Sequence, residues 1–548
     1  MPAATDSIPA TAVKKAELID DKTTRRFYEQ FKKKRKAFYD LTSGINDHPD
    51  RTNKEGTDEI ISETNQAKQL FVSLVLHRLM FCYFLQKNGL LDGNVHYLRD
   101  KLQSHPSFYS SFLVKLFNVG LSTPERTDQL KNLLGDVPYL SAGLFKEHEI
   151  EKKFVIEIDD RAFELIFSFF DEWEWTSGDK INGGEKILNP DIVGHIFEKY
   201  INDRAQMGAY YTNGDITDYI SSSCILPWLF EETERNYRGS FNAGSIIGAY
   251  LQSGMDAYVF AAAKHGMDEP LPSEIEAGIR DATNRNKWNK QAPSIFALPG
   301  ETWREIIERR EHFENVTRHT SNDAVQMNDF ITFNLNIKKF AKHVIEQTDD
   351  ALFLETFYKS LSTINVLDPT CGSGAFLLAA INILQPLHES CIRRMEKFIQ
   401  DAPGDTYQYF HKVLDEVRSS QNTGLRFSII KSIINNNLFG VDIMQEAVET
   451  AKMRLLIRLL PEVEALNNSA DLLETLPQIN FNLRTGNALI GFVSTDEPEK
   501  NNGINSIDPN RNDGKDHLNA QLNKQLFEQS GSNDYEEWLS THQPFNWL

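Results

Sequence analysis

Apolar residues recur at helical spacing through the first third of the chain. From Gln66 to Gln86 they cover most of the circumference of the predicted helix, which therefore belongs at the centre of a helical domain. Asn88-Gly89 is a typical helix end. His77 interrupts the apolar run, and no residue at metal-ligand spacing lies near it, so we expect a hydrogen-bonded core histidine.

Upstream of this helix, the pattern predicts a second helix from Asp21, with an aromatic stripe that would be buried. Residues 1–20 are small and polar and are predicted to be disordered, and residues 44–60 to form a loop. The aromatic residues of 167–175 are expected to pack in the core. The stripe consists of Phe27, Tyr28, Phe31, Phe38 and Tyr39.

The second half of the chain contains short apolar runs that end in polar residues, which is typical of strands in an α/β sheet. Ile364–Leu367 predicts a short buried strand that ends at Asp368. A second strand spans residues 437–443, with Asp442 near its end, and a third lies within residues 479–491. The helix after Gln445 has one apolar face, which suits packing on a sheet.

The turn after Asp368 carries the candidate chemistry. Gly372 and Gly374 remove side chains where a ligand would approach the backbone, and the helix predicted from Ala375 directs unpaired N–H groups towards that ligand. A strand, a glycine-rich turn and a helix form the nucleotide-binding start of a doubly wound α/β sheet. No lysine follows the glycines, so the turn is not a P-loop. A purely structural turn is the alternative.

The segment Asp-Pro-Thr-Cys-Gly-Ser-Gly resembles the (D/N)PxCGSG motif of adenine-N6 DNA methyltransferases, which binds S-adenosylmethionine. The resemblance implies a Rossmann-like methyltransferase sheet. Asp442 can accept hydrogen bonds from ribose hydroxyls, as an acidic residue at this place does in nucleotide-binding folds. Asn487 would reach the adenine edge, with a generic turn as the alternative. The implied cofactor-binding residues in this half are Asp368, Pro369, Thr370, Gly372, Gly374, Phe376, Asp442, Ile443, Asn487 and Ala488.

A second block of resemblance lies upstream, in Met-Gly-Ala-Tyr-Tyr-Thr. It is similar to the G-A-Y-Y-T-P segment that folds over the cofactor in these enzymes, although Asn213 replaces the usual proline. Ordinary aromatic packing in a strand and turn is the alternative. The residues that match are Gly208, Tyr210, Tyr211 and Thr212.

The net charge of −20 does not favour nucleic acid as a partner for the chain as a whole, because duplex binding is driven largely by cationic contacts to phosphate. Any surface that grips DNA is therefore expected to be a small part of this chain or to lie on another chain. The basic run Lys32–Lys36 is either a phosphate contact or, as we prefer, a solvated helix face. The four cysteines show no metal spacing, and no metal site is predicted. We expect reduced thiols in a cytoplasmic protein without a signal peptide or membrane-spanning run.

The catalytic segment of adenine-N6 methyltransferases, (N/D)-P-P-(Y/F/W), does not occur in the 548 residues. We therefore expect no catalytic residue on this chain, which resembles only the N-terminal half of a full enzyme. Residues 1–180 contain acidic residues and lysines but no convincing nuclease order. The expected units are a disordered N-terminus (1–20), a helical domain (21–180), a cofactor-binding domain (181–495) with a helical insertion at about 225–360, and a polar tail (496–548).

The resemblance is to large type IIG or BREX-like enzymes of restriction–modification and phage-exclusion systems. It implies methyl transfer from S-adenosylmethionine to adenine in double-stranded DNA, with a second subunit supplying the catalytic motif and target recognition. The alternative is a non-catalytic subunit, or a truncated product, that senses the cofactor or assembles a defence complex.

Overall fold

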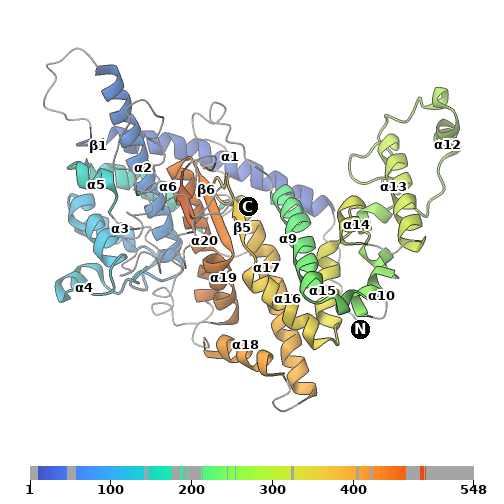
Figure 1. The fold of residues 1–548 in the computed structure, drawn as a ribbon. Helices are drawn as coiled ribbons and strands as arrows, with labels where there is room; N and C mark the ends of the chain where they lie inside the picture. The colour runs from blue at the N-terminus through green and yellow to red at the C-terminus, as the bar shows by residue number, and fades with distance from the viewer. Residues whose placement is uncertain are drawn as a thin grey trace, which may run out of the picture.

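The computed structural model describes residues 10–45, 57–140, 145, 147–175, 186–188, 194, 212, 214–242, 245–252, 255–322, 326–402, 407–419, 424–464, 482–486 and 488. Most of these residues are helical, and three small sheets are present. In Figure 1 the largest sheet lies in the middle of the molecule, with the helices of residues 57–170 on one side and the helices of residues 214–363 on the other, and the helix of residues 10–40 runs across from one side to the other.

The N-terminal part is helical, as predicted, and two strand pairs join its loops. β1 (Thr42–Ser43) pairs antiparallel with β2 (Glu157–Ile158), and β3 (Glu174–Trp175) pairs parallel with β4 (Ile187–Leu188). Its helices are α1 (Ala10–Asp40), α2 (Thr57–Lys87), α3 (Tyr97–Ser104), η1 (Tyr109–Leu113), η2 (Leu116–Gly120), α4 (Asp128–Leu134), α5 (Glu149–Lys153) and α6 (Asp160–Phe170).

Two helix starts were predicted too late. α1 begins at Ala10 and not at Asp21, and α2 begins at Thr57, inside the predicted loop. The first turns of α1 are rich in alanine and lysine, which are strong helix formers. Their polarity led us to predict disorder for residues that continue the helix. The predicted end of α2 is confirmed, because Gly89 has a φ of 71° and Leu90 N–H donates to the carbonyl of Leu85.

The aromatic stripe of α1 is buried, as expected. The ring of Phe27 lies 4.9 Å from the ring centroids of both Phe169 and Trp173. Phe38 meets Phe163 edge-on at 5.3 Å. α1 is therefore fixed against α6 by aromatic contacts, which also confirms the predicted packing role of the 167–175 segment.

Two helices were more apolar than we expected. By length and composition alone, Ala67–Lys87 of α2 and Ala375–Asp401 (α17) could each cross a membrane. However, 89% and 72% of their apolar windows are buried inside the protein. Burial in the core accounts for this apolarity, because a helix surrounded by other helices is hydrophobic all round.

The predicted insertion is helical. Its elements, with the flanking helix α9, are α9 (Gly214–Asn236), η3 (Arg238–Phe241), α10 (Ile246–Gln252), η4 (Met255–Tyr258), α11 (Ala261–Lys264), α12 (Ser273–Arg280), η5 (Ala282–Asn284), α13 (Trp303–Asn322), α14 (Met327–Thr332), α15 (Ile337–Gln347) and α16 (Ala351–Thr363).

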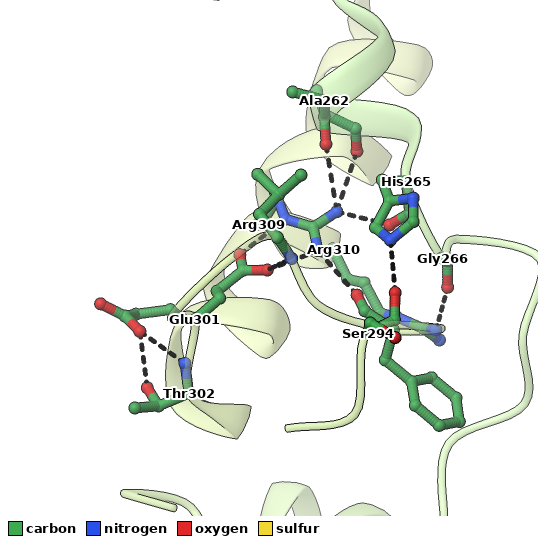
Figure 2. Close-up of polar contacts among 12 residues, drawn as sticks. Ala262, His265, Gly266, Ser294, Glu301, Thr302, Arg309 and Arg310 are labelled. Atoms are coloured by element: carbon green, nitrogen blue, oxygen red, sulfur yellow. Dashed lines mark hydrogen bonds and ion pairs between the residues drawn. The ribbon is translucent and has the colours of Figure 1, made fainter. Parts of the chain in front are cut away.

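Part of the insertion, around α12 and α13, projects from the rest of the molecule in Figure 1 and has a small apolar core of its own around Trp288 and Trp303. Arg309 fastens it. Its guanidinium binds both carboxylate oxygens of Glu301, at 2.7 and 2.9 Å, and the carbonyls of His265 and Phe296 (Figure 2). Such charge-assisted contacts give an irregular segment with little secondary structure a defined conformation. At the start of α13, Glu305 accepts from Thr302 N–H at 2.7 Å.

The central sheet has three parallel strands in the order β5-β6-β7. β5 follows α16, and α17 follows β5, as the strand–turn–helix pattern predicted. Its elements are β5 (Val366–Asp368), α17 (Ala375–Asp401), α18 (Gln408–Ser419), α19 (Leu425–Asn436), β6 (Leu438–Asp442), α20 (Gln445–Ile457), α21 (Leu460–Glu464) and β7 (Leu483–Thr485).

β5 is less buried than predicted. Val366 and Leu367 are half-buried, because β5 lies at one edge of the described sheet and pairs only with β6 among the described residues. α20, in contrast, is more buried than predicted, because we expected only one apolar face of this helix to be covered. It packs on β6 and β7, and α2 of the N-terminal domain covers another part of its surface.

Candidate cofactor site

The glycine-rich turn connects the carboxyl end of β5 to the N-terminus of α17. Asp368 is the last residue of β5, and its Oδ1 accepts from Thr370 N–H at 3.1 Å. Cys371 N–H donates to the carbonyl of Val441 on β6 at 2.9 Å. The turn is thereby fastened to the neighbouring strand, and the N-terminal N–H groups of α17 lie at the same edge of the sheet. A helix N-terminus at this place favours an anionic or electron-rich ligand group.

Gly374 is required for two reasons, and neither depends on a ligand. Its φ is +84°, a left-handed conformation that caps α17. A Cβ at this position would also lie 3.1 Å from Cβ of Ala451 on α20. We expected the glycine to make room for a ligand. The structure shows that it makes room for a helix that packs behind the turn, and its part in ligand binding stays a prediction.

Asp442 is the central residue of the site. Its Oδ2 accepts from Gly372 N–H at 2.9 Å, and its Oδ1 accepts from Met444 N–H at 2.8 Å. Its carbonyl accepts from Gly486 N–H, just after β7, at 2.9 Å. One residue at the tip of β6 therefore connects the turn after β5 with the end of β7. A carboxylate has about four acceptor positions, so two remain for hydroxyl donors of a ligand.

Arg454 on α20 supports the turn from behind, and the sequence analysis missed it. Its side chain is buried, with Nη1 donating to both the carbonyl and Oγ of Ser373, at 2.8 and 2.6 Å. A Cβ at Gly194 would lie 2.3 Å from Cζ of Arg454, so the backbone at residue 194 also approaches this guanidinium closely. The only feature of the sequence that could have identified Arg454 is that a charged residue interrupts the apolar stretch of a helix predicted to pack on a sheet.

A second missed feature is the polar contact between the N-terminal domain and α20. Nε2 of His77 lies 3.1 Å from Oγ1 of Thr450, and the side-chain Nε2 atoms of Gln445 and His148 are 2.8 Å apart. Burial, followed by the charge of Arg35, lowers the pKa of His77 from 6.5 to about 3. His77 is therefore a neutral, hydrogen-bonded core histidine, as predicted, and its partner belongs to the helix that follows β6.

Glu151, an acidic residue of the N-terminal domain, has a structural role. Nη1 of Arg78 lies 3.0 Å from each of its carboxylate oxygens, and Tyr109 Oη donates to Oε1 at 3.1 Å. Both side chains of the ion pair are almost fully buried. A buried carboxylate held by an arginine in this way is committed to the core of the N-terminal domain.

The structure brings many of the predicted cofactor residues to one edge of the sheet. Asp368 and Asp442 lie at the ends of adjacent parallel strands, Pro369 and Thr370 are exposed in the turn, and Ile443 is 66% exposed next to Asp442. Gly372 and Gly374 complete the turn, Phe376 is half-buried in the first turn of α17, and Ala488 follows β7.

The remaining predicted residues are not brought to the site by the described structure. Thr212 is half-buried, just before α9, and no described contact joins it to the turn. Gly208, Tyr210, Tyr211 and Asn487 lie outside the described residues. Their part in a cofactor site remains a prediction.

Comparisons with known proteins point to the same part of the chain. Residues 339–496 match the family described as "MmeI, DNA-methyltransferase domain", a range that contains β5, β6 and β7. The chain is 25% identical over 510 residues, 88% of its length, to a putative type II restriction enzyme and methyltransferase of Methanocaldococcus jannaschii. It is also 26% identical over 157 residues, 28% of its length, to DNA methyltransferase A of Bacillus subtilis.

The chain spans 33% of the length of the archaeal relative, and the bacterial match covers 16% of that relative's length. No solved structure matches. The chain is thus similar to DNA methyltransferases, and the range matched by the family contains the three strand ends joined by Asp442.

Proposed function

We propose that this chain binds S-adenosyl-L-methionine as the cofactor-binding part of a site-specific DNA adenine-N6 methyltransferase in a restriction–modification or phage-defence system. One observation carries the proposal. Within the matched methyltransferase domain, Asp442 at the tip of β6 holds the glycine-rich turn after β5 and the end of β7 together. That arrangement is the place where a doubly wound fold binds a nucleoside.

The chain's own residues would position the cofactor, which supplies a methyl group on an already electrophilic sulfonium. The two free acceptor positions of Asp442 suit the ribose hydroxyls, and the turn at Gly372 and Gly374 would pass along the methionine part. Asn487 would read the adenine edge, and the Tyr210–Thr212 segment would close over the site. The residues present thus fit the cofactor, and we expect the protein to act in the cytoplasm.

We further propose that catalysis needs a second part that supplies the Asn-Pro-Pro-Tyr motif and DNA recognition. The motif does not occur in this sequence. In addition, β5 has one open side among the described residues, where a doubly wound sheet would continue. The alternative, a non-catalytic subunit that senses the cofactor, predicts the same cofactor binding but no methyl transfer in any combination with a neighbouring gene product.

Substitution of Asp442 tests the cofactor site. We expect Asp442→Ala to weaken S-adenosylmethionine binding by roughly 1–3 kcal/mol, or about 5- to 150-fold, because hydrogen bonds to the ribose and to Gly372 N–H are lost. Isothermal titration calorimetry measures the affinity. Asp401→Ala is the matched control, because Asp401 is an exposed aspartate at the far end of α17. Equal affinities of the Asp442→Ala and Asp401→Ala proteins would remove Asp442 from the site.

A further inference from the structure

α1 is a basic helix in an acidic protein. Its sequence contains ten lysines and arginines and five acidic residues, whereas the whole chain has a net charge of −20. The densest part is the run from Lys32 to Lys36. Such a local reversal of charge has two explanations, a solvated helix face or a surface for an anionic partner, and the structure helps to decide between them.

Aromatic packing fixes which way the cations point. Phe27, Phe31 and Phe38 are 0%, 3% and 1% exposed and hold one face of α1 in the core. The opposite face is therefore presented to solvent. Its exposed cations are Arg25, Arg26, Lys32, Lys33 and Lys36, which we call the α1 cationic face.

Arg35 shows that the sequence run and the surface differ. Its Nη2 donates to Oγ of Ser73 on α2 at 2.9 Å, so this arginine is directed towards the protein. Lys34 is half-buried. The helical periodicity of α1 thus determines which cations face solvent. The α1 cationic face extends further towards the N-terminus than the basic run in the sequence.

These cations are poorly neutralised. Arg25 forms an ion pair with Glu29 at 3.5 Å, and both side chains are largely exposed. Within the described ranges, no carboxylate lies within 4.0 Å of the side-chain nitrogens of Arg26, Lys32, Lys33 or Lys36. Elsewhere on the surface, many exposed cations have such a partner, for example Lys359 with Glu355 and Arg280 with Glu276. An acidic protein that leaves four neighbouring cations unpaired has a site that attracts a polyanion.

The packing of α1 also limits the kind of polyanion. A basic amphipathic helix binds a membrane by inserting its apolar face, but the apolar face of α1 is occupied by the protein core. From Arg25 to Lys36 the helix rises by about 16 Å, at about 1.5 Å per residue. Duplex DNA carries one charge per about 1.7 Å of axis, so several phosphates lie within reach of this face.

We propose that the α1 cationic face binds the phosphate backbone of duplex DNA. The inference rests on the proposed function for the identity of the polyanion. Contacts of this kind carry no sequence information and hold the duplex in place while another part of the enzyme reads the target. They also give an acidic chain one surface at which electrostatic repulsion does not keep DNA away.

The test compares Lys32→Gln/Lys33→Gln/Lys36→Gln with Lys342→Gln/Lys359→Gln/Lys412→Gln in the full chain. Both triple variants remove three exposed cations from helices, but each control lysine lies near a carboxylate. Fluorescence anisotropy with a labelled duplex, from 25 mM to 200 mM NaCl, measures the affinity and its salt dependence. We expect the α1 variant to bind at least about tenfold more weakly at the lowest salt, and its log–log slope to fall by up to about 2.7. We expect the control variant to match the wild type.

Equal binding by the two triple variants would overturn the proposal, and so would a wild-type protein that binds no duplex at 25 mM NaCl. Loss of binding to anionic phosphatidylserine vesicles with unchanged duplex binding would assign the face to a membrane instead. Calorimetric titration of each protein with S-adenosylmethionine separates the two proposals. A wild-type chain that binds the cofactor but no duplex rejects only the role of α1, whereas a wild-type chain without cofactor affinity rejects the proposed function.

Discussion

At the scale of single residues, the site depends on a few polar side chains that hold the backbone in place. Asp442 accepts two backbone N–H groups from different segments, and Arg454 binds Ser373 through both its carbonyl and its hydroxyl. Neither side chain needs a ligand to be ordered. The turn after β5 is therefore arranged before any ligand binds, which lowers the entropic cost of binding.

Arg454 gives a prediction at this scale. Lysine keeps the charge but not the planar fork, so Arg454→Lys should loosen the turn around Ser373 and weaken cofactor binding by about 5- to 100-fold. Arg458→Lys is the control, because Arg458 caps the C-terminus of α20, one turn further on, and donates to Gln385 instead. Calorimetry with the cofactor measures the effect.

A fall in thermal stability of the Arg454→Lys protein with unchanged cofactor affinity would show that Arg454 only supports the core. Ser373→Ala separates the two contacts. If the hydroxyl is the important partner, Ser373→Ala and the double variant should bind the cofactor equally weakly.

At the scale of elements, the sequence predicted the strands and helices around the site but not how they are covered. The strand–turn–helix at Asp368 and the strand ending at Asp442 were predictable, because short apolar runs next to glycine and aspartate leave few alternatives. The contact of α2 with α20 was not predictable, because it joins residues 373 positions apart, such as His77 and Thr450. Local pattern also missed that α1 starts at Ala10, since polarity hid its helix propensity.

The α2–α20 contact gives a prediction about pH. His77 has a pKa of about 3 in the folded protein and about 6.5 when unfolded, so the unfolded chain binds the extra proton first as the pH falls. The stabilising effect of the neutral ring is complete above pH 6.5 and is lost progressively towards pH 3. Urea unfolding from pH 7 to pH 4.5 should show stability falling more steeply in the wild type than in His77→Gln, by up to about 1.4 kcal/mol per pH unit.

Equal slopes for the wild type and His77→Gln would mean that the buried ring can take up a proton in the folded state. His388 on α17 is the internal comparison. Burial lowers its pKa to about 4, so His388→Gln should also reduce the slope, although its ring lies on a different helix.

At the scale of the whole molecule, an acidic chain presents one basic helix, and β5 pairs only with β6 among the described residues. The α1 cationic face and β5 belong to different parts of the fold, and the proposed function would use both. The order of the three described strands could be expected from the pattern. What completes the sheet could not, because the described residues contain one partner for β5.

Methyl transfer is the prediction for the whole molecule. The purified chain should transfer no methyl group from tritiated S-adenosylmethionine to duplex DNA, because it lacks the Asn-Pro-Pro-Tyr motif. Addition of a protein encoded downstream that carries this motif should restore transfer to adenine. Methyl transfer by the chain alone would refute the proposal that catalysis needs a second part. Cofactor binding without methyl transfer in any mixture would favour the non-catalytic, cofactor-sensing subunit.

The apolar core gives a final consequence. It continues without interruption from Phe27 on α1 to Leu483 on β7, and it includes the buried surface where α2 meets α20. Dissecting the gene near residue 180 would therefore cut through a shared interior. A fragment that contained the sheet but not α2 would expose the apolar surface of α20 to solvent. The two halves are therefore expected to fold as one cooperative unit, although their proposed roles differ.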